Sequence, residues 1–256
     1  MTKIFVAIFM IALSFQAIAA KNKSSDYAPA GTSFESTPNR GNILRCSWNG
    51  QNYQPMNTRN GQFIGKPGYG FKYLSGCEKI VQGSTRFSVC QWNGKNYQPY
   101  GIRNNVAVGK TDYGFSNIDV CIKSVLASRR GRVVCQWNGN NYQPHFARNG
   151  KAVGKTDYGF KTLDGCLKTA NAAQNGFVCQ WNGQNHQAYQ MRSNEQVGKP
   201  DYGFKYLDGC LKTTRHSVRG EICNWDGQGY TIYAFPGNKE FGRFRDLQRC
   251  FDRLSW

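Results

Sequence analysis

Ten cysteines recur along this chain at a nearly fixed period, and that period constrains the fold more than any other feature. The first cysteines of successive copies lie 44, 45, 44 and 44 residues apart, and a second cysteine follows 31 residues later in four copies and 27 later in the fifth. Such a period is typical of a chain built from small repeated units. We therefore expect five repeats, at 45–88, 89–132, 133–176, 177–220 and a truncated fifth at 221–256 that suits a terminal cap.

Other residues keep step with the cysteines. A tryptophan lies two places after the first cysteine of every copy, at Trp48, Trp92, Trp137, Trp181 and Trp225. Asn-Gly follows it in four copies, and this dipeptide favours a hairpin with a two-residue loop because both positions tolerate positive φ. An apolar helical pattern closes each unit, beginning near the capping residues Ser116 and Thr162. The fold class is therefore α+β, with a short three-stranded meander and a short helix in each repeat.

The second cysteine of each copy lies on the apolar face of the expected helix, as Ile118, Cys121 and Ile122 show. This placement predicts that each cysteine pairs within its own repeat. The five pairs are Cys46 with Cys77, Cys90 with Cys121, Cys135 with Cys166, Cys179 with Cys210, and Cys223 with Cys250. Units this small need such a crosslink, because burial alone rarely stabilises them. The pattern leaves three arrangements open: separate beads, an open array, or a closed five-unit α/β propeller.

The N-terminus has the pattern of a cleavable secretory signal at residues 1–19. Lys3 precedes an apolar run at 4–15, and Ala17-Ile18-Ala19 supplies small residues for cleavage. The run is shorter than the ~20 residues that a membrane span requires. Residues 20–44, rich in Ser, Pro, Gly, Lys and Asn, then suggest a flexible lead-in. We expect a secreted protein, extracellular or periplasmic, without a transmembrane segment in the mature chain.

The chain is strongly basic, with 33 Lys and Arg against 15 Asp and Glu, a formal charge of +18. Such an excess favours anionic partners, namely cell-wall polymers, lipopolysaccharide, sulfated glycans, lipid headgroups or nucleic acid. Export and the lack of a base-stacking motif make nucleic acid the minor expectation. The alternative is that the charge only maintains solubility.

The sequence offers little that indicates catalysis. Two series of carboxylates recur, at Asp112, Asp157 and Asp201 and at Asp119, Asp164 and Asp208, but the first repeat lacks both. They leave a paired-carboxylate glycosidase as an alternative, although the second series also suits the first turn of a helix. Without paired CxxC motifs or a repeated histidine, the pattern indicates no zinc site. We expect no enzyme, no cofactor and no metal.

A recurring set of Tyr, Arg and Lys is the candidate ligand-binding set. Sugar rings stack on aromatic rings, while Arg and Lys bind carboxylate or phosphate groups. The candidates are Tyr53, Arg59, Lys66, Tyr97, Arg103, Lys110, Tyr142, Arg148, Lys155, Arg192 and Lys199. Each Lys follows a glycine, which permits close approach of backbone or ligand. Whether the recurring Trp is core or a ligand platform stays open.

The sequence therefore suggests a secreted, non-enzymatic, multivalent binding protein that recognises a glycan or an anionic cell-envelope polymer. Its layout resembles multivalent repeat lectins in general design, since five similar modules each carry one aromatic and basic set. Two alternatives remain. One is a disulfide-rich scaffold that binds or inhibits a protein partner, and the other is a membrane-active cationic protein.

Overall fold

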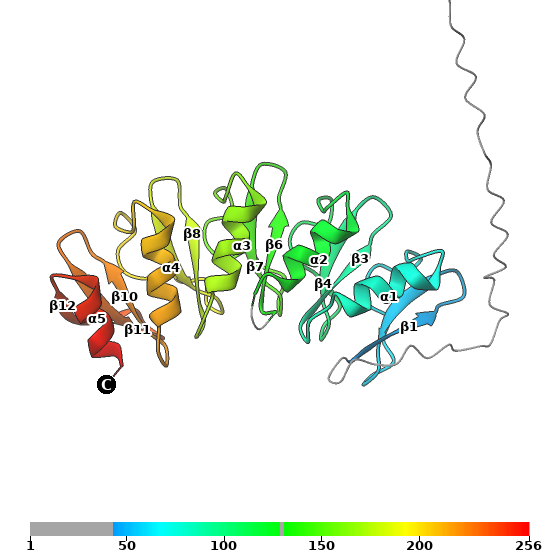
Figure 1. Ribbon diagram of the computed structural model, residues 1–256, viewed down its shortest axis with the longest axis horizontal. Coiled ribbons are helices and arrows are strands. Elements are labelled where there is room, and N and C mark those ends of the chain that lie inside the picture. Colours follow the sequence, from blue (N-terminus) through cyan, green and yellow to red (C-terminus); the bar gives the residue numbers. More distant parts are fainter. Residues whose placement is uncertain (1–42, 129–130, 256) are drawn as a thin grey trace, which may run out of the picture. The chain divides into compact units, whose positions relative to one another are not determined.

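The computed structural model describes residues 43–128 and 131–255 of the chain (Figure 1). The expected signal at 1–19 and all of the lead-in up to residue 42 lie outside the described residues. Within them the chain forms five helices and several small antiparallel sheets, in a repeated order of hairpin followed by helix. The predicted repeat is confirmed at this level.

Each repeat opens with an antiparallel pair of five-residue strands. The pairs are β1 (Leu44–Trp48) with β2 (Tyr53–Asn57), β3 (Ser88–Trp92) with β4 (Tyr97–Gly101), β6 (Val133–Trp137) with β7 (Tyr142–Phe146), β8 (Phe177–Trp181) with β9 (His186–Gln190), and β10 (Glu221–Trp225) with β11 (Tyr230–Ala234). The hairpin loop has four residues rather than two, because the Asn49 side chain accepts hydrogen bonds from the backbone N–H groups of Gln51 and Asn52. Gly50 has φ +98° there.

The third strand is complete only in the fifth repeat, as β12 (Lys239–Phe244). The second repeat has the two-residue β5 (Val106–Ala107), and the other three repeats have a single bridge such as Met56 to Phe63. The expectation of a third strand was wrong for these three. The segment turns at a glycine with positive φ, and the N–H of that glycine bonds to the following repeat instead of continuing the sheet, as at Gly65.

A helix follows each hairpin. The helices are α1 (Leu74–Gln82), α2 (Ile118–Leu126), α3 (Leu163–Ala172), α4 (Leu207–His216) and α5 (Leu247–Leu254). Thr162 caps α3 as predicted, accepting a hydrogen bond from the Gly165 N–H at 3.3 Å. Asn117 rather than Ser116 caps α2, because the Asn117 side chain accepts from the Asp119 N–H at 2.7 Å.

Five disulfides join each helix to the first strand of its own hairpin, which confirms the predicted pairing. They are Cys46–Cys77, Cys90–Cys121, Cys135–Cys166, Cys179–Cys210 and Cys223–Cys250. All ten cysteines are buried. Each bond therefore lies in the core between helix and hairpin.

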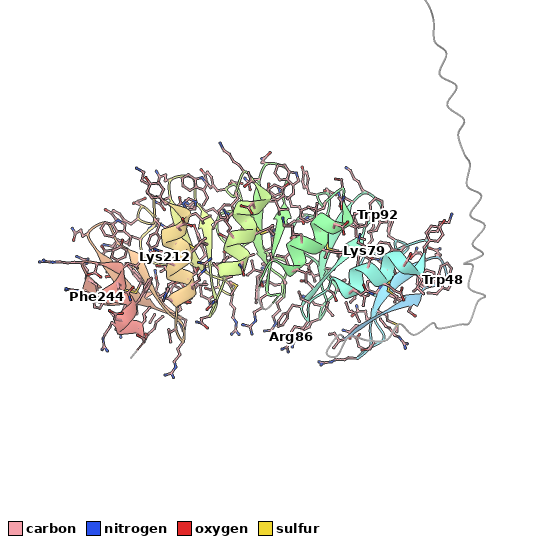
Figure 2. The ribbon with its side chains drawn as sticks, in the orientation of Figure 1. Trp48, Lys79, Arg86, Trp92, Lys212 and Phe244 are labelled. Carbon is pink, nitrogen blue, oxygen red and sulfur yellow. A yellow bond between two sulfur atoms is a disulfide. The ribbon has the colours of Figure 1, made fainter. Side chains whose placement is uncertain are left out.

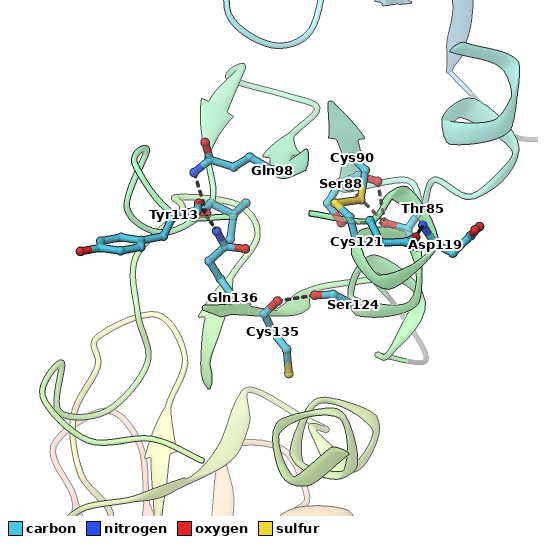
Figure 3. Close-up of a disulfide and its surroundings, with 12 residues drawn as sticks. Thr85, Ser88, Cys90, Gln98, Tyr113, Asp119, Cys121, Ser124, Cys135 and Gln136 are labelled. Carbon is cyan, nitrogen blue, oxygen red and sulfur yellow. Dashed lines mark hydrogen bonds between the residues drawn. A yellow bond between two sulfur atoms is a disulfide. The ribbon is translucent and has the colours of Figure 1, made fainter. Parts of the chain in front are cut away.

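The repeats share their cores with their sequence neighbours. Ile64 and Ile80 of the first repeat belong to the same buried cluster as Val89 and Ile102 of the second. The Ser124 hydroxyl in α2 donates to the Cys135 carbonyl at the start of the next repeat (Figure 3). The described residues form no closed propeller or barrel. The repeats are therefore neither independent beads nor blades of a closed ring.

Candidate functional site

The structure separates the predicted Tyr, Arg and Lys set into two groups at opposite ends of the hairpin. Tyr53 faces Trp48 next to the four-residue loop, and the Lys66 carbonyl accepts a hydrogen bond from the buried Gln54 side chain at 3.2 Å. Arg59 follows Asn57, where β2 ends. The strand spans about 13 Å at ~3.3 Å per residue. Tyr53 and Arg59 therefore lie at different ends and form no single site.

The recurring tyrosines and tryptophans pack against each other. Trp48 and Tyr53 meet with ring centroids 5.0 Å apart, and Trp92 and Tyr97 at 5.1 Å. Tyr97 also stacks on Phe71 of the preceding repeat at 6.3 Å. The tyrosines are half-buried, and so are the tryptophans except Trp48, which is 42% exposed. These rings therefore contribute chiefly to packing within and between repeats.

The glycine of each Gly-Lys pair is an inter-repeat contact. The Asn105 side chain accepts a hydrogen bond from the Gly65 N–H at 2.6 Å and donates one to the Gly65 carbonyl at 3.3 Å. Asn194 makes the same two bonds to Gly154 at 2.6 and 3.3 Å. A Cβ on Gly65 would lie 2.4 Å from Cγ of Gln91. The close approach expected at this glycine is therefore an approach of one repeat to the next.

A second set of inter-repeat bonds comes from buried glutamines that the sequence reasoning missed. The Gln136 side chain, fully buried, donates to the Tyr113 carbonyl of the preceding repeat at 2.6 Å (Figure 3). Gln91 and Gln180 make the equivalent bonds to the carbonyls of Tyr69 and Tyr158. The available signal was the recurring Gln between the first cysteine and the tryptophan. The first repeat, with no repeat before it in the described chain, has Ser there instead.

The four lysines of this set, Lys66, Lys110, Lys155 and Lys199, are exposed at the loop end. The Lys66 ammonium lies 4.8 Å from the centroid of the Tyr69 ring. The arginines lie at the other end of the strands. Figure 2 shows Arg86 at the edge of the ribbon opposite Trp92, with β3 between them.

A groove of about 510 Å³ crosses the arginine end of several repeats, and we call it the arginine groove. Six arginines from four repeats line it: Arg86, Arg103, Arg132, Arg148, Arg192 and Arg219. Among the described residues that line it, none is acidic. Of the predicted arginines, Arg103, Arg148 and Arg192 therefore share one surface, whereas Arg59 does not line it.

Strand pairing explains why these arginines gather. The Ile102 N–H donates to the Phe87 carbonyl at 2.9 Å, which brings the neighbouring Arg86 and Arg103 to one end of the hairpin. In the third repeat, the Ala147 N–H donates to the Arg132 carbonyl at 2.8 Å, so Arg132 lies beside Arg148. Arg86, Arg132 and Arg219, which lie between a helix and the next hairpin, were not predicted as site residues, because their grouping with the other arginines depends on this register.

Local features hold two of the groove arginines in defined positions. The guanidinium carbons of Arg86 and Arg132 lie 5.1 and 5.7 Å from the centroid of the same Phe87 ring. Arg219 has φ +48°, a conformation that is costly for a residue with a Cβ. The equivalent Asn175 and Gly131 have φ +47° and +61°, so this conformation belongs to a recurring turn. Phe146 and Met191 supply buried apolar surface to the same groove.

The recurring carboxylates lie elsewhere. Asp119 in the first turn of α2 pairs with Lys79 of the preceding repeat at 2.7 Å, and Asp164 pairs with Lys168 at 3.1 Å. Within 43–128 and 131–255, no three His, Cys, Asp or Glu side chains gather as ligands for a metal ion. A search of those same residues finds no helix with the length and apolarity of a membrane span.

One histidine is deeply buried beside an inter-repeat contact. His145 is 4% exposed, and its Nε2 would lie 3.2 Å from a Cβ placed on Gly109. Burial lowers the pKa of His145 to about 4, partly offset by a hydrogen bond to the Gln143 carbonyl at 3.0 Å. The ring is therefore neutral near pH 7 and belongs to the packing.

No protein-family model matches this chain, and no curated protein matches its sequence.

Proposed function

We propose that this protein is a secreted, non-enzymatic binding protein that holds an anionic polymer along the arginine groove. An acidic glycan or cell-envelope polymer is the ligand class that fits best. The observation that carries the proposal is the gathering of six arginines from four repeats in one groove whose described lining residues include no carboxylate.

The charges of the groove support a ligand with repeated negative groups. Like charges held together repel, so a counter-charge supplied by a ligand is favourable there. Arginine suits this role because its planar guanidinium donates two parallel hydrogen bonds to carboxylate, sulfate or phosphate. Since neighbouring repeats each contribute arginines, a polymer lying across them contacts several at once, and each further contact adds to avidity.

The disulfides support an oxidising compartment for this function. Five disulfides in a chain of this size are typical of exported proteins. Anionic polymers that such a protein meets outside the cytoplasm include acidic polysaccharides, lipopolysaccharide and sulfated glycans.

The test compares two variants that lose the same charge from the same repeats. One carries Arg103→Gln, Arg148→Gln and Arg192→Gln. The other carries Lys110→Gln, Lys155→Gln and Lys199→Gln at the opposite end of the strands. Binding of the full chain to heparin, a sulfated polymer, is measured by calorimetry at low and physiological salt.

We expect the arginine variant to bind about 10- to 100-fold more weakly, because each exposed ion pair contributes ~0.5–1 kcal/mol. The lysine variant should stay close to the unchanged protein. Equal losses in both variants would mean that net charge alone attracts the polymer. Binding that does not weaken as salt rises would also contradict the proposal, since exposed charges are screened over ~8 Å at physiological ionic strength.

A further inference from the structure

We propose that the junction of the second and third repeats is the principal subsite of the arginine groove, and that it takes a sulfate or phosphate ester group in preference to a carboxylate. This inference rests on the proposed function and names the chemistry of the polymer.

The junction holds more arginines than the rest of the groove. Arg86 and Arg103 flank the β3–β4 hairpin of the second repeat, and Arg132 and Arg148 flank the β6–β7 hairpin of the third. Arg192 follows β9 in the fourth repeat, and Arg219 precedes β10 of the fifth. Four of the six groove arginines therefore lie at one boundary.

The backbone at this junction is fixed by hydrogen bonds across the boundary. The Asn104 side chain donates to the Arg148 carbonyl at 2.7 Å, which ties the turn after β4 to the turn after β7. A Cβ on Gly101 would lie 2.6 Å from the Ala147 carbonyl oxygen, so the two backbone segments are in close contact. The arginines of the two repeats are thus anchored on one continuous framework.

Phe87 is the feature that distinguishes this junction. Its half-buried ring lies beneath guanidinium groups from two repeats, those of Arg86 and Arg132. A guanidinium that lies over a ring directs its N–H groups outward from its edge, in the plane of the group. Phe87 stands three places before the first cysteine of its hairpin, and the residues at the same place before β6, β8 and β10 are Arg132, Gly176 and Gly220, none of which has an aromatic ring. Phe87 is therefore a positioning residue for this subsite.

The shape of the ligand group follows from this arrangement. A carboxylate is planar and has two acceptor oxygens, so its hydrogen bonds lie close to one plane. A sulfate or phosphate ester has three terminal oxygens arranged tetrahedrally, so it accepts hydrogen bonds from several guanidinium groups that approach from different directions. Four arginines anchored on two repeats provide such directions.

The experiment measures binding of the full chain to three dextran derivatives of equal size that are matched in charged groups per glucose: dextran sulfate, dextran phosphate with monoester groups, and carboxymethyl dextran. We expect dextran sulfate or dextran phosphate, or both, to bind at least tenfold more tightly than carboxymethyl dextran at equal ionic strength. The first two polymers distinguish the two sources of a tetrahedral group. Carboxymethyl dextran binding as tightly as both would overturn the inference.

Variants then test the role of Phe87. Phe87→Leu keeps an apolar side chain but removes the ring, and should weaken binding of the preferred polymer about fivefold or more, while Phe87→Tyr should restore it. Phe241→Leu is the matched control, because Lys239 lies 5.2 Å from the Phe241 ring outside the groove. Arg86→Lys, which keeps the charge and loses the planar fork, should also weaken binding.

The outcomes separate the two proposals. Failure of the unchanged protein to bind any of the three polymers refutes the proposed function itself. Binding that Phe87→Leu and Phe241→Leu reduce equally, with both variants folded by circular dichroism, leaves the arginine groove intact and refutes the subsite.

Discussion

The contact between repeats makes a sharp prediction at Gly65. Gly65 has φ +104°, and a Cβ there would lie 2.4 Å from Cγ of Gln91, which is fully buried in the next repeat. Gly50 in the same repeat has φ +98°, but a Cβ there would have no heavy atom within 4 Å. The two glycines therefore share a positive φ, and only at Gly65 would a Cβ clash with the next repeat.

Gly50→Ala should cost about 1–2 kcal/mol, the usual penalty for a Cβ in the left-handed region. Gly65→Ala adds an overpacked interface, which costs ~1–3 kcal/mol more. Because Gln91 belongs to the second repeat, this additional cost falls on the boundary between repeats. Since a repeat protein need not unfold in one step, the readout must be local.

Hydrogen exchange with mass spectrometry, on protein with its disulfides intact, provides that readout. Gly65→Ala should accelerate exchange in peptides of the first repeat and of 88–92, whereas Gly50→Ala should affect mainly its own hairpin. Gly65→Ala should cost less in a Gln91→Ala background than in the unchanged protein, because Gln91→Ala removes the Cγ and Cδ atoms that clash. Equal effects of Gly50→Ala and Gly65→Ala, or the same cost of Gly65→Ala in both backgrounds, would refute the assignment of this glycine to the interface.

Three further predictions concern stability. Asn194→Gly tolerates the φ of +60° but loses the two hydrogen bonds to Gly154. It should lower the free energy of unfolding by about 1–3 kcal/mol and lower the exchange protection of the Gly154 amide. Unchanged protection would contradict the role of these two bonds. Replacing both Cys135 and Cys166 with Ser removes a disulfide with a sequence separation of 31. This change should destabilise the third repeat by ~3–4 kcal/mol and lower its melting temperature. An unchanged melting temperature would exclude a stabilising role for this disulfide. Burial lowers the pKa of His145 from 6.5 to about 4, so the neutral ring contributes stability that is present above pH 6.5 and lost as the pH falls toward 4. His145→Tyr should therefore reduce the change in melting temperature between pH 6.5 and 4. A melting temperature that falls as steeply in the variant as in the unchanged protein would contradict this prediction.

Features confined to one repeat were predictable from the sequence. The cysteine period and the apolar helix face gave the correct disulfides, since both partners of each bond lie in one copy. The hairpin was predictable for the same reason, because the residues that form it are adjacent in the chain. Its loop is longer than expected because the Asn49 side chain stabilises a four-residue turn.

Features between repeats were harder to predict, because an interface residue recurs with the same period as a residue of a repeated binding site. Gly65 and Gln91 recur because each boundary needs them, and the period alone gives no means of separating this role from ligand binding. The prediction of a third strand was wrong in three repeats for the same reason, since the backbone of that segment bonds to the next repeat. Predicting the arginine groove would have required the strand register, because the register brings Arg86 and Arg132, which precede the first strand of their hairpins, beside Arg103 and Arg148.

Covalent footprinting can show whether a polymer lies on the arginine groove. The chain is treated with an arginine-selective and a lysine-selective reagent, with and without heparin, and modified peptides are quantified by mass spectrometry. We expect protection of Arg86, Arg103, Arg132, Arg148, Arg192 and Arg219, with Arg59 and the four loop-end lysines labelled as before. Protection of those lysines with unchanged labelling of the groove arginines would contradict it.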